Sequence, residues 1–257
     1  MDVQQIVYPP IELYLHSKDS QYTGDYYNDC TFNFERPFIA PPGYSMYLQV
    51  LSFTMPNVFH VVNEYNNHIV INGYDYTLAV GNYSITQLVA VLTKLDANVS
   101  CRFDSITLQA IFTSETTLTL SGPLCVLLGI PENSAGTTIA STHTVDMSGT
   151  NSAYLLTDLS SSSSSIDSRV GSDSVLCRIP VTTPAGSIIQ YQDFNGRAGL
   201  LLDDDAVSQI RLLLEDEDRR PLLATLHWQL TLQVRFLYTG RQRMQVYQPV
   251  SFRVPPV

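Results

Sequence analysis

The most regular hydrophobic pattern of the chain lies in its last quarter, in residues 226–238. Apolar side chains occupy every even-numbered position, and polar ones fill the odd positions up to Arg235. The apolar positions are Leu226, Trp228, Leu230, Leu232, Val234, Phe236 and Tyr238. A period of two places the two sets on opposite faces of a strand. At about 3.3 Å per residue, we expect a strand of roughly 40 Å with one face in a core.

Seven other segments show the same alternation over shorter distances, and turn-forming sequences such as Pro41-Pro42-Gly43 and Asn195-Gly196 separate them. These segments are residues 11–15, 32–34, 44–50, 175–181, 189–191, 200–202 and 210–214. Eight strands without helices between most of them predict an all-β fold. We expect a single jelly-roll sandwich with eight strands in two antiparallel sheets.

The middle of the chain departs from this pattern and predicts a small α+β insertion. Apolar residues at 85, 88, 89, 92 and 95 have helical spacing, and Ser84 with Gln87 forms a capping-box sequence before them. Strand-like segments flank this helix. We therefore expect a discontinuous jelly-roll domain, residues 1–65 and 136–257, and an insertion domain, residues 66–135.

A segment rich in Ser, Thr and Gly follows the insertion, from Asn133 to Asp173. Serine fills every position from 160 to 165, which is typical of an exposed loop. Tyr154-Leu155-Leu156 interrupts the polar run and suggests one short strand.

The composition is unusual for the surface of a soluble monomer. The chain has 15 Tyr and 10 Phe, whereas its only lysines are Lys18 and Lys94. Surfaces rich in Tyr and poor in Lys are typical of protein–protein contacts. Tyrosines that simply pack within strands are the alternative explanation.

The net charge of −10 argues against nucleic-acid binding over a broad surface, because phosphates require a basic footprint. The charge is uneven, however: residues 219–257 contain six Arg and no acidic residue. Three explanations stay open for this stretch: contacts between copies of the chain, a tail that faces packaged nucleic acid, and arginines that are solvated or paired locally.

The four cysteines, Cys30, Cys101, Cys125 and Cys177, are far apart and form no CxxC pair. The first residues show no signal-peptide pattern, and no apolar run approaches the 18 or so residues of a membrane span. We expect a protein made in the cell interior and not secreted, with free thiols and without a membrane span. The sequons at Asn82 and Asn98 would then stay unused.

No motif for catalysis is found in the sequence. The histidines at 16, 60, 68, 143 and 227 lie in no metal-binding spacing, and no nucleophile elbow, Walker loop or dinucleotide fingerprint occurs. His143 with Asp158 is the nearest approach to a triad. We expect no enzyme activity, no small-molecule substrate, no cofactor, and neither catalytic nor metal-binding residues.

Two acidic clusters, Asp203–Asp205 and Glu215–Asp218, follow or precede predicted strands. They could share a cation site at one end of the sandwich, or they could be solvated turns. We expect Trp228 to pack in the core rather than to form an exposed sugar-stacking platform. The closing segment, residues 246–257, is either an extended arm lying on a neighbouring subunit or a frayed tail.

Taken in order, these features resemble the penton (minor capsid, vertex) proteins of virophages and of Polinton- or adintovirus-like double-stranded DNA viruses. The resemblance is carried by Ile11–Leu15 with Ser17-Lys18-Asp19, Thr31–Phe34, Phe53–Asn57, Gly81–Ser84, Leu127–Ile130, Ile179-Pro180-Val181, and Leu214–Glu217 before the Trp228 strand. The chain departs from the family pattern at Arg219-Arg220, where a Gly-containing turn is usual, and in its rather short insertion.

This resemblance implies a structural protein of the virion without an active site. It implies a homopentamer at the icosahedral vertices of the capsid, in contact with major capsid proteins and with other minor capsid proteins. The alternative is a receptor- or carbohydrate-binding β-sandwich module of a virion, with the insertion and the Ser-rich loop at its binding end.

Overall fold

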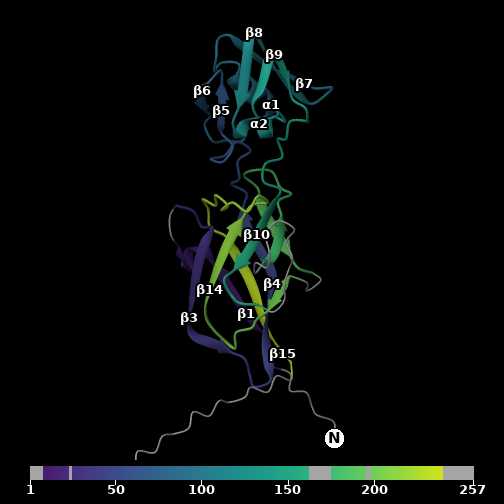
Figure 1. The fold of residues 1–257 in the computed structure, drawn as a ribbon. Coiled ribbons are helices and arrows are strands. Elements are labelled where there is room, and N and C mark those ends of the chain that lie inside the picture. Colours follow the sequence, from purple (N-terminus) through teal and green to yellow (C-terminus); the bar gives the residue numbers. More distant parts are fainter. Residues whose placement is uncertain (1–7, 23–24, 162–174, 195–197, 240–257) are drawn as a thin grey trace, which may run out of the picture.

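The computed structural model describes residues 8–22, 25–161, 175–194 and 198–239. The chain forms two units stacked along one long axis: a large β-sandwich, and a smaller α+β unit beyond one end of it (Figure 1). No helix within these described ranges is long and apolar enough to cross a membrane.

The sandwich is built from two antiparallel sheets. The first has the order β1-β15-β4-β12, with β13 also paired to β4, and the second has the order β11-β10-β14-β3-β2. The strand bounds are β1 Ile11–His16, β2 Gln21–Tyr22, β3 Asp29–Ile39, β4 Tyr44–Pro56, β10 Ser152–Thr157, β11 Val175–Pro180, β12 Ile188–Gln192, β13 Gly199–Leu201, β14 Ala206–Glu215 and β15 Gln229–Tyr238.

The connectivity of these strands is that of a jelly roll. Strands β12 and β13 lie along β4 in continuous order, so they act as one interrupted strand. We number the eight strands 1 to 8 by their order along the chain, leaving out the two-residue β2. The first sheet then has the strand order 1-8-3-6, and the second has the order 5-4-7-2. Such nested Greek keys define the jelly roll. The predicted all-β jelly-roll fold is confirmed.

All eight predicted strands occur, but they do not correspond one to one to the eight strands of the jelly roll. Two of them, 189–191 and 200–202, belong to the single interrupted strand β12–β13. The short strand suggested at Tyr154-Leu155-Leu156 occurs as part of β10, which lies between β11 and β14 inside the second sheet. The remainder of the serine run, from residue 162 onwards, lies outside the described residues.

The long terminal strand is shorter than its alternation suggests. β15 begins at Gln229, and Leu226 is 48% exposed although it belongs to the apolar set. The chain turns before the strand: the carbonyl of Ala224 accepts a hydrogen bond from the amide of Tyr27 in another segment. Trp228 is completely buried, as predicted, and its indole Nε1 donates to the carbonyl of Tyr27 at 2.6 Å.

The smaller unit is a sheet covered by two short helices. Its strands have the order β6-β5-β8-β7, with β9 paired to β8. The bounds are β5 His68–Ile71, β6 Tyr74–Thr77, α1 Ile85–Leu92, β7 Val99–Asp104, β8 Gln109–Ser121, α2 Pro123–Leu127 and β9 Ser134–Ala140. The capping box is present, since Ser84 Oγ accepts from Gln87 N and Gln87 Oε1 accepts from Ser84 N.

Each unit has its own hydrophobic core. Residues from Val62 to Ile139 form the core of the smaller unit, and Val61, Val145 and Met147 pack against it. Strand β9 crosses the predicted boundary at residues 135 and 136. The division into 1–65 with 136–257 and 66–135 stays a prediction.

The sandwich has two different ends. The insertion leaves it after Pro56 of β4 and returns at Ser152 of β10. At the opposite end, Tyr238 of β15 pairs with Tyr44 of β4, and the Tyr8 ring lies 5.0 Å from that of Tyr44. The described chain therefore enters and leaves at the end that is remote from the insertion.

Candidate functional site

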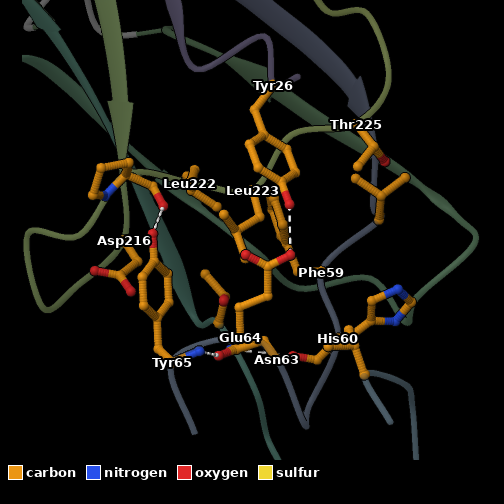
Figure 2. A pocket seen from close by; sticks show the side chains of 14 residues that line it. Tyr26, Phe59, His60, Asn63, Glu64, Tyr65, Asp216, Leu222, Leu223 and Thr225 are labelled. Atoms are coloured by element: carbon orange, nitrogen blue, oxygen red, sulfur yellow. Dashed lines mark hydrogen bonds between the residues drawn. The ribbon is translucent and has the colours of Figure 1, made fainter. Parts of the chain in front are cut away.

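A cavity of about 150 Å³ lies at the neck between the two units (Figure 2). Five parts of the chain form it: the connection after β4, the connection between β14 and β15, Tyr26 before β3, Val80 after β6 and Thr150 before β10. It is lined by Tyr26, Val58, Phe59, His60, Asn63, Glu64, Tyr65, Val80, Thr150, Asp216, Pro221, Leu222, Leu223 and Thr225. These residues are distant in sequence, and no motif joins them.

Hydrogen bonds across this neck hold the insertion to the sandwich. The Tyr65 hydroxyl donates to the carbonyl of Pro221 at 2.8 Å, and the Tyr26 hydroxyl donates to Glu64 Oε1 at 2.6 Å (Figure 2). The Arg220 guanidinium lies 5.4 Å from the centre of the Tyr65 ring, within the range of a cation–π contact. The neck is therefore a joint with specific contacts and not a bare linker.

The acidic turn Glu215–Asp218 forms part of the same joint. Asp216 Oδ1 accepts hydrogen bonds from the amides of Asp218 and Arg220, each at 2.8 Å. Glu217 accepts from the amides of Asn151 and Ser152, where the chain re-enters the sandwich. Burial raises the pKa of Asp216, while these two amide hydrogen bonds oppose the rise. The turn Glu215–Asp218 therefore holds together the segments that meet at the neck. For this cluster, the alternative of a purely solvated turn is wrong.

The two acidic clusters cannot share a cation site. They lie before and after β14, which spans Ala206–Glu215, so about 30 Å separates them at 3.3 Å per residue. Among the described residues, no group of three or more His, Cys, Asp or Glu side chains is arranged to hold a metal ion.

His143 and Asp158, the nearest approach to a triad, lie in different units. Asp158 Oδ1 accepts from the amide of Arg211 at 3.1 Å within the sandwich. The amide of His143 donates to the carbonyl of Gly129 in the insertion. The structure does not bring the two side chains together as a base and its orienting carboxylate.

All four cysteines are free and buried. Burial raises the pKa of Cys101 to about 12 and that of Cys125 to about 11; for Cys177, burial and then the nearby Asp193 raise it to about 12. Thiols of this kind are unreactive near neutral pH. The prediction of free thiols is confirmed.

The arginines from 219 onwards do not form one basic face. Arg219 pairs with Glu215 at 3.1 Å and Arg220 approaches Asp218 at 3.7 Å, both at the neck. Arg235 lies far along β15, and its Nε donates to Gln233 Oε1. Arg241, Arg243 and Arg253, like the predicted arm from 246 to 257, lie outside the described residues. Local pairing therefore accounts for Arg219 and Arg220.

The outer face of the first sheet carries mostly polar side chains across β1, β15 and β4, although Gln49 and Gln233 on it are buried. The backbone register aligns Glu12 with Gln233 and Gln49, Tyr14 with Thr231 and Ser52, and His16 with Gln229 and Thr54. Tyr14 is 77% exposed. Exposed aromatic side chains such as Tyr14 are enriched at protein contacts.

Comparisons with known proteins give one finding for the fold. No protein-family model matches the sequence, and no curated protein matches it. The structure is similar to the crystal structure of the mavirus penton protein, with a TM-score of 0.46 and 11% sequence identity. The similarity covers 90% of this chain and all of that one.

Proposed function

We propose that this chain is a structural subunit of an icosahedral virus shell, a minor capsid protein that forms homopentamers at the vertices. Jelly rolls build viral capsids, although they also occur in lectins and cupins, so the fold alone does not decide the function. The ordered sequence resemblance to penton proteins supports the capsid role among these possibilities.

The observation that carries the proposal is the two-ended construction of the subunit. One end of the sandwich bears the insertion, and the described chain enters and leaves at the other (Figure 1). The sides between these ends expose sheet faces, one of which carries the exposed Tyr14. A subunit with different ends and available sides can close a ring through repeated heterologous contacts around an axis.

In this arrangement the insertion, residues 66–135 in the sequence-based division, acts as a separate domain that projects from the shell. It exposes large apolar side chains, among them Ile106 at 92% and Val126 at 78%. Exposed apolar groups mark contact sites when they gather in one patch. The remote end of the sandwich would face the particle interior, and the sides would meet sister copies and major capsid proteins.

The proposal includes no catalytic step. The carboxylates at the neck accept hydrogen bonds from neighbouring groups, Glu64 from the Tyr26 hydroxyl and Glu217 from the amide of Asn151. We assign these contacts to the orientation of the insertion.

A receptor- or glycan-binding module is the second candidate, and the exposed Ile106 and Tyr74 of the insertion favour it. The two functions predict different masses for the purified protein. A shell subunit forms a particle of about five times 28.7 kDa or joins assemblies of the major capsid protein, whereas a binding module stays monomeric and retains glycans or receptors. Sedimentation of the purified chain, alone and with the major capsid protein, separates these outcomes. A monomer that never joins the capsid protein contradicts the proposal.

A further inference from the structure

The cavity at the neck combines an apolar wall with a negatively charged one. Phe59 and Leu222 line it and are 9% and 3% exposed, whereas Glu64 is exposed to solvent. The Glu64 carboxylate points toward the Tyr26 hydroxyl (Figure 2). The volume of about 150 Å³ is roughly ten times the space that one water molecule needs. The cavity can therefore hold a small chemical group.

Glu64 has one carboxylate oxygen without a partner. Its Oε1 accepts from the Tyr26 hydroxyl, and within the described ranges Oε2 takes part in no hydrogen bond and the carboxylate in no ion pair. The arginines of the neck are engaged with other acids: Arg219 pairs with Glu215, and Arg220 approaches Asp218. Negative charge beside an apolar wall attracts a cation strongly, because the wall excludes the water that would screen it.

Asp216 adds a second negative charge to the same cavity. Burial raises the pKa of Asp216, and the charges of Asp218 and Glu217 raise it further, against the effect of its two amide hydrogen bonds. The pKa of Tyr65, which also lines the cavity, is raised first by burial and then by the charges of Asp216 and Glu64. Both carboxylates therefore act on the same space.

Aromatic rings form a further part of the lining. Tyr26, Phe59 and Tyr65 all border the cavity, and none of them stacks on another aromatic ring of the described chain. The face of an aromatic ring carries partial negative charge and attracts cations. Aromatic rings with a carboxylate are the combination that recognises ammonium groups.

The carboxylates suit an ammonium group better than a guanidinium group. A guanidinium binds a carboxylate through two parallel hydrogen bonds, one to each oxygen. Glu64 Oε1 and Asp216 Oδ1 already accept hydrogen bonds, so each carboxylate offers one oxygen. The ammonium of lysine needs only one oxygen for each bond, and its unbranched stem packs well against apolar side chains such as Phe59 and Leu222.

The chain itself is a poor source of this lysine. It contains two lysines in 257 residues, Lys18 and Lys94, and neither lines the cavity. Its net charge of −10 also favours contacts with a partner that supplies basic side chains. Another protein is therefore the better donor.

We propose that the neck cavity binds a lysine side chain of a neighbouring shell protein of a different kind, with the ammonium at Glu64 and the stem against Phe59 and Leu222. This inference rests on the proposed function, since it names one contact of the shell subunit.

A binding titration of the full chain with blocked amino acids tests the chemistry of the cavity. The probe is N-acetyl-lysine methylamide, followed by nuclear magnetic resonance at pH 7.5. The norleucine analogue has no charge and the arginine analogue has a guanidinium, so they separate the effects of charge and head-group shape. Glu64→Gln keeps an acceptor for the Tyr26 hydroxyl and removes the charge. Glu132→Gln is the matched control, because Glu132 is also exposed but lies outside the cavity.

We expect the lysine probe to bind at least fivefold more tightly than either analogue, with shifts at Tyr26, Phe59 and Tyr65. Glu64→Gln should weaken this binding at least fivefold, and Glu132→Gln should leave it unchanged. No binding of the lysine probe, equal binding of the norleucine analogue, or unchanged affinity in Glu64→Gln overturns the inference.

Carbodiimide treatment of the purified particle tests the partner, because this reagent joins a carboxylate directly to an amine in contact with it. Mass spectrometry should find Glu64 joined to a lysine of another shell protein, with Glu132 as the internal reference that is not joined. A particle that contains this chain without the Glu64 bond, or with a bond to Lys18 or Lys94 of a sister copy, overturns the inference alone. A particle that lacks the chain overturns the proposed function.

Discussion

Trp228 and Leu226 belong to one apolar alternation, yet the structure assigns them different roles. Trp228 is completely buried, whereas Leu226 is 48% exposed. The Trp228 ring packs 5.9 Å from that of Phe32 and 5.8 Å from that of Phe53, and its Nε1 donates to the carbonyl of Tyr27. Substitutions at the two positions should therefore differ in their cost.

We predict that Trp228→Phe lowers the free energy of unfolding by about 2–4 kcal/mol. The smaller ring leaves a cavity of a few atoms, which costs about 1–2 kcal/mol, and the carbonyl of Tyr27 loses its donor, which costs another 1–2 kcal/mol or so. Leu226→Ala is the control and should cost less than about 1 kcal/mol, because the side chain is half exposed.

Urea unfolding followed by far-ultraviolet circular dichroism measures both values, since the substitution removes the tryptophan fluorescence. The slope with urea should stay unchanged, so that the midpoint reports stability. If Leu226→Ala is as destabilising as Trp228→Phe, the Leu226 side chain must be packed in the core. The chain would then already belong to the sheet at residue 226, and the observed start of β15 at Gln229 would be wrong.

Two further predictions concern titratable groups. Burial raises the pKa of Asp216, so the carboxylate destabilises the fold increasingly as the pH rises above its ordinary value of 3.8. Asp216→Asn should raise the melting temperature at pH 7, because it removes the partly buried charge, and the gain should disappear below about pH 3.8. A lower melting temperature of the variant at pH 7 contradicts this explanation. Cys101 and Cys177, with pKa values of about 12, should resist a thiol reagent at pH 8 in the folded protein and react in urea; rapid reaction of the native protein is the contrary result.

The sequence predicts best the elements whose two faces meet different surroundings. The alternation in β15 and the capping box of α1 are local patterns, so they could be read directly. β10 was underestimated because most of its residues are buried on both faces: Leu155 lies in the core, and Leu156 on the other face is covered as well. A strand that is buried on both sides loses the period of two.

The neck could not be predicted from the sequence for a different reason. Its contacts join segments that are far apart along the chain, such as Tyr65 with Pro221 and Glu217 with Asn151. The acidic turn has the composition of a solvated loop, and its structural role depends on backbone amides that only the fold brings near. No local pattern identifies such partners.

The most direct test of the account is an electron-microscopy map of the virus particle that contains this chain. The expected result is five copies of the sandwich around each vertex, with the α+β insertion at the outer end. Vertices occupied by another protein, or a particle that lacks this chain, would contradict it.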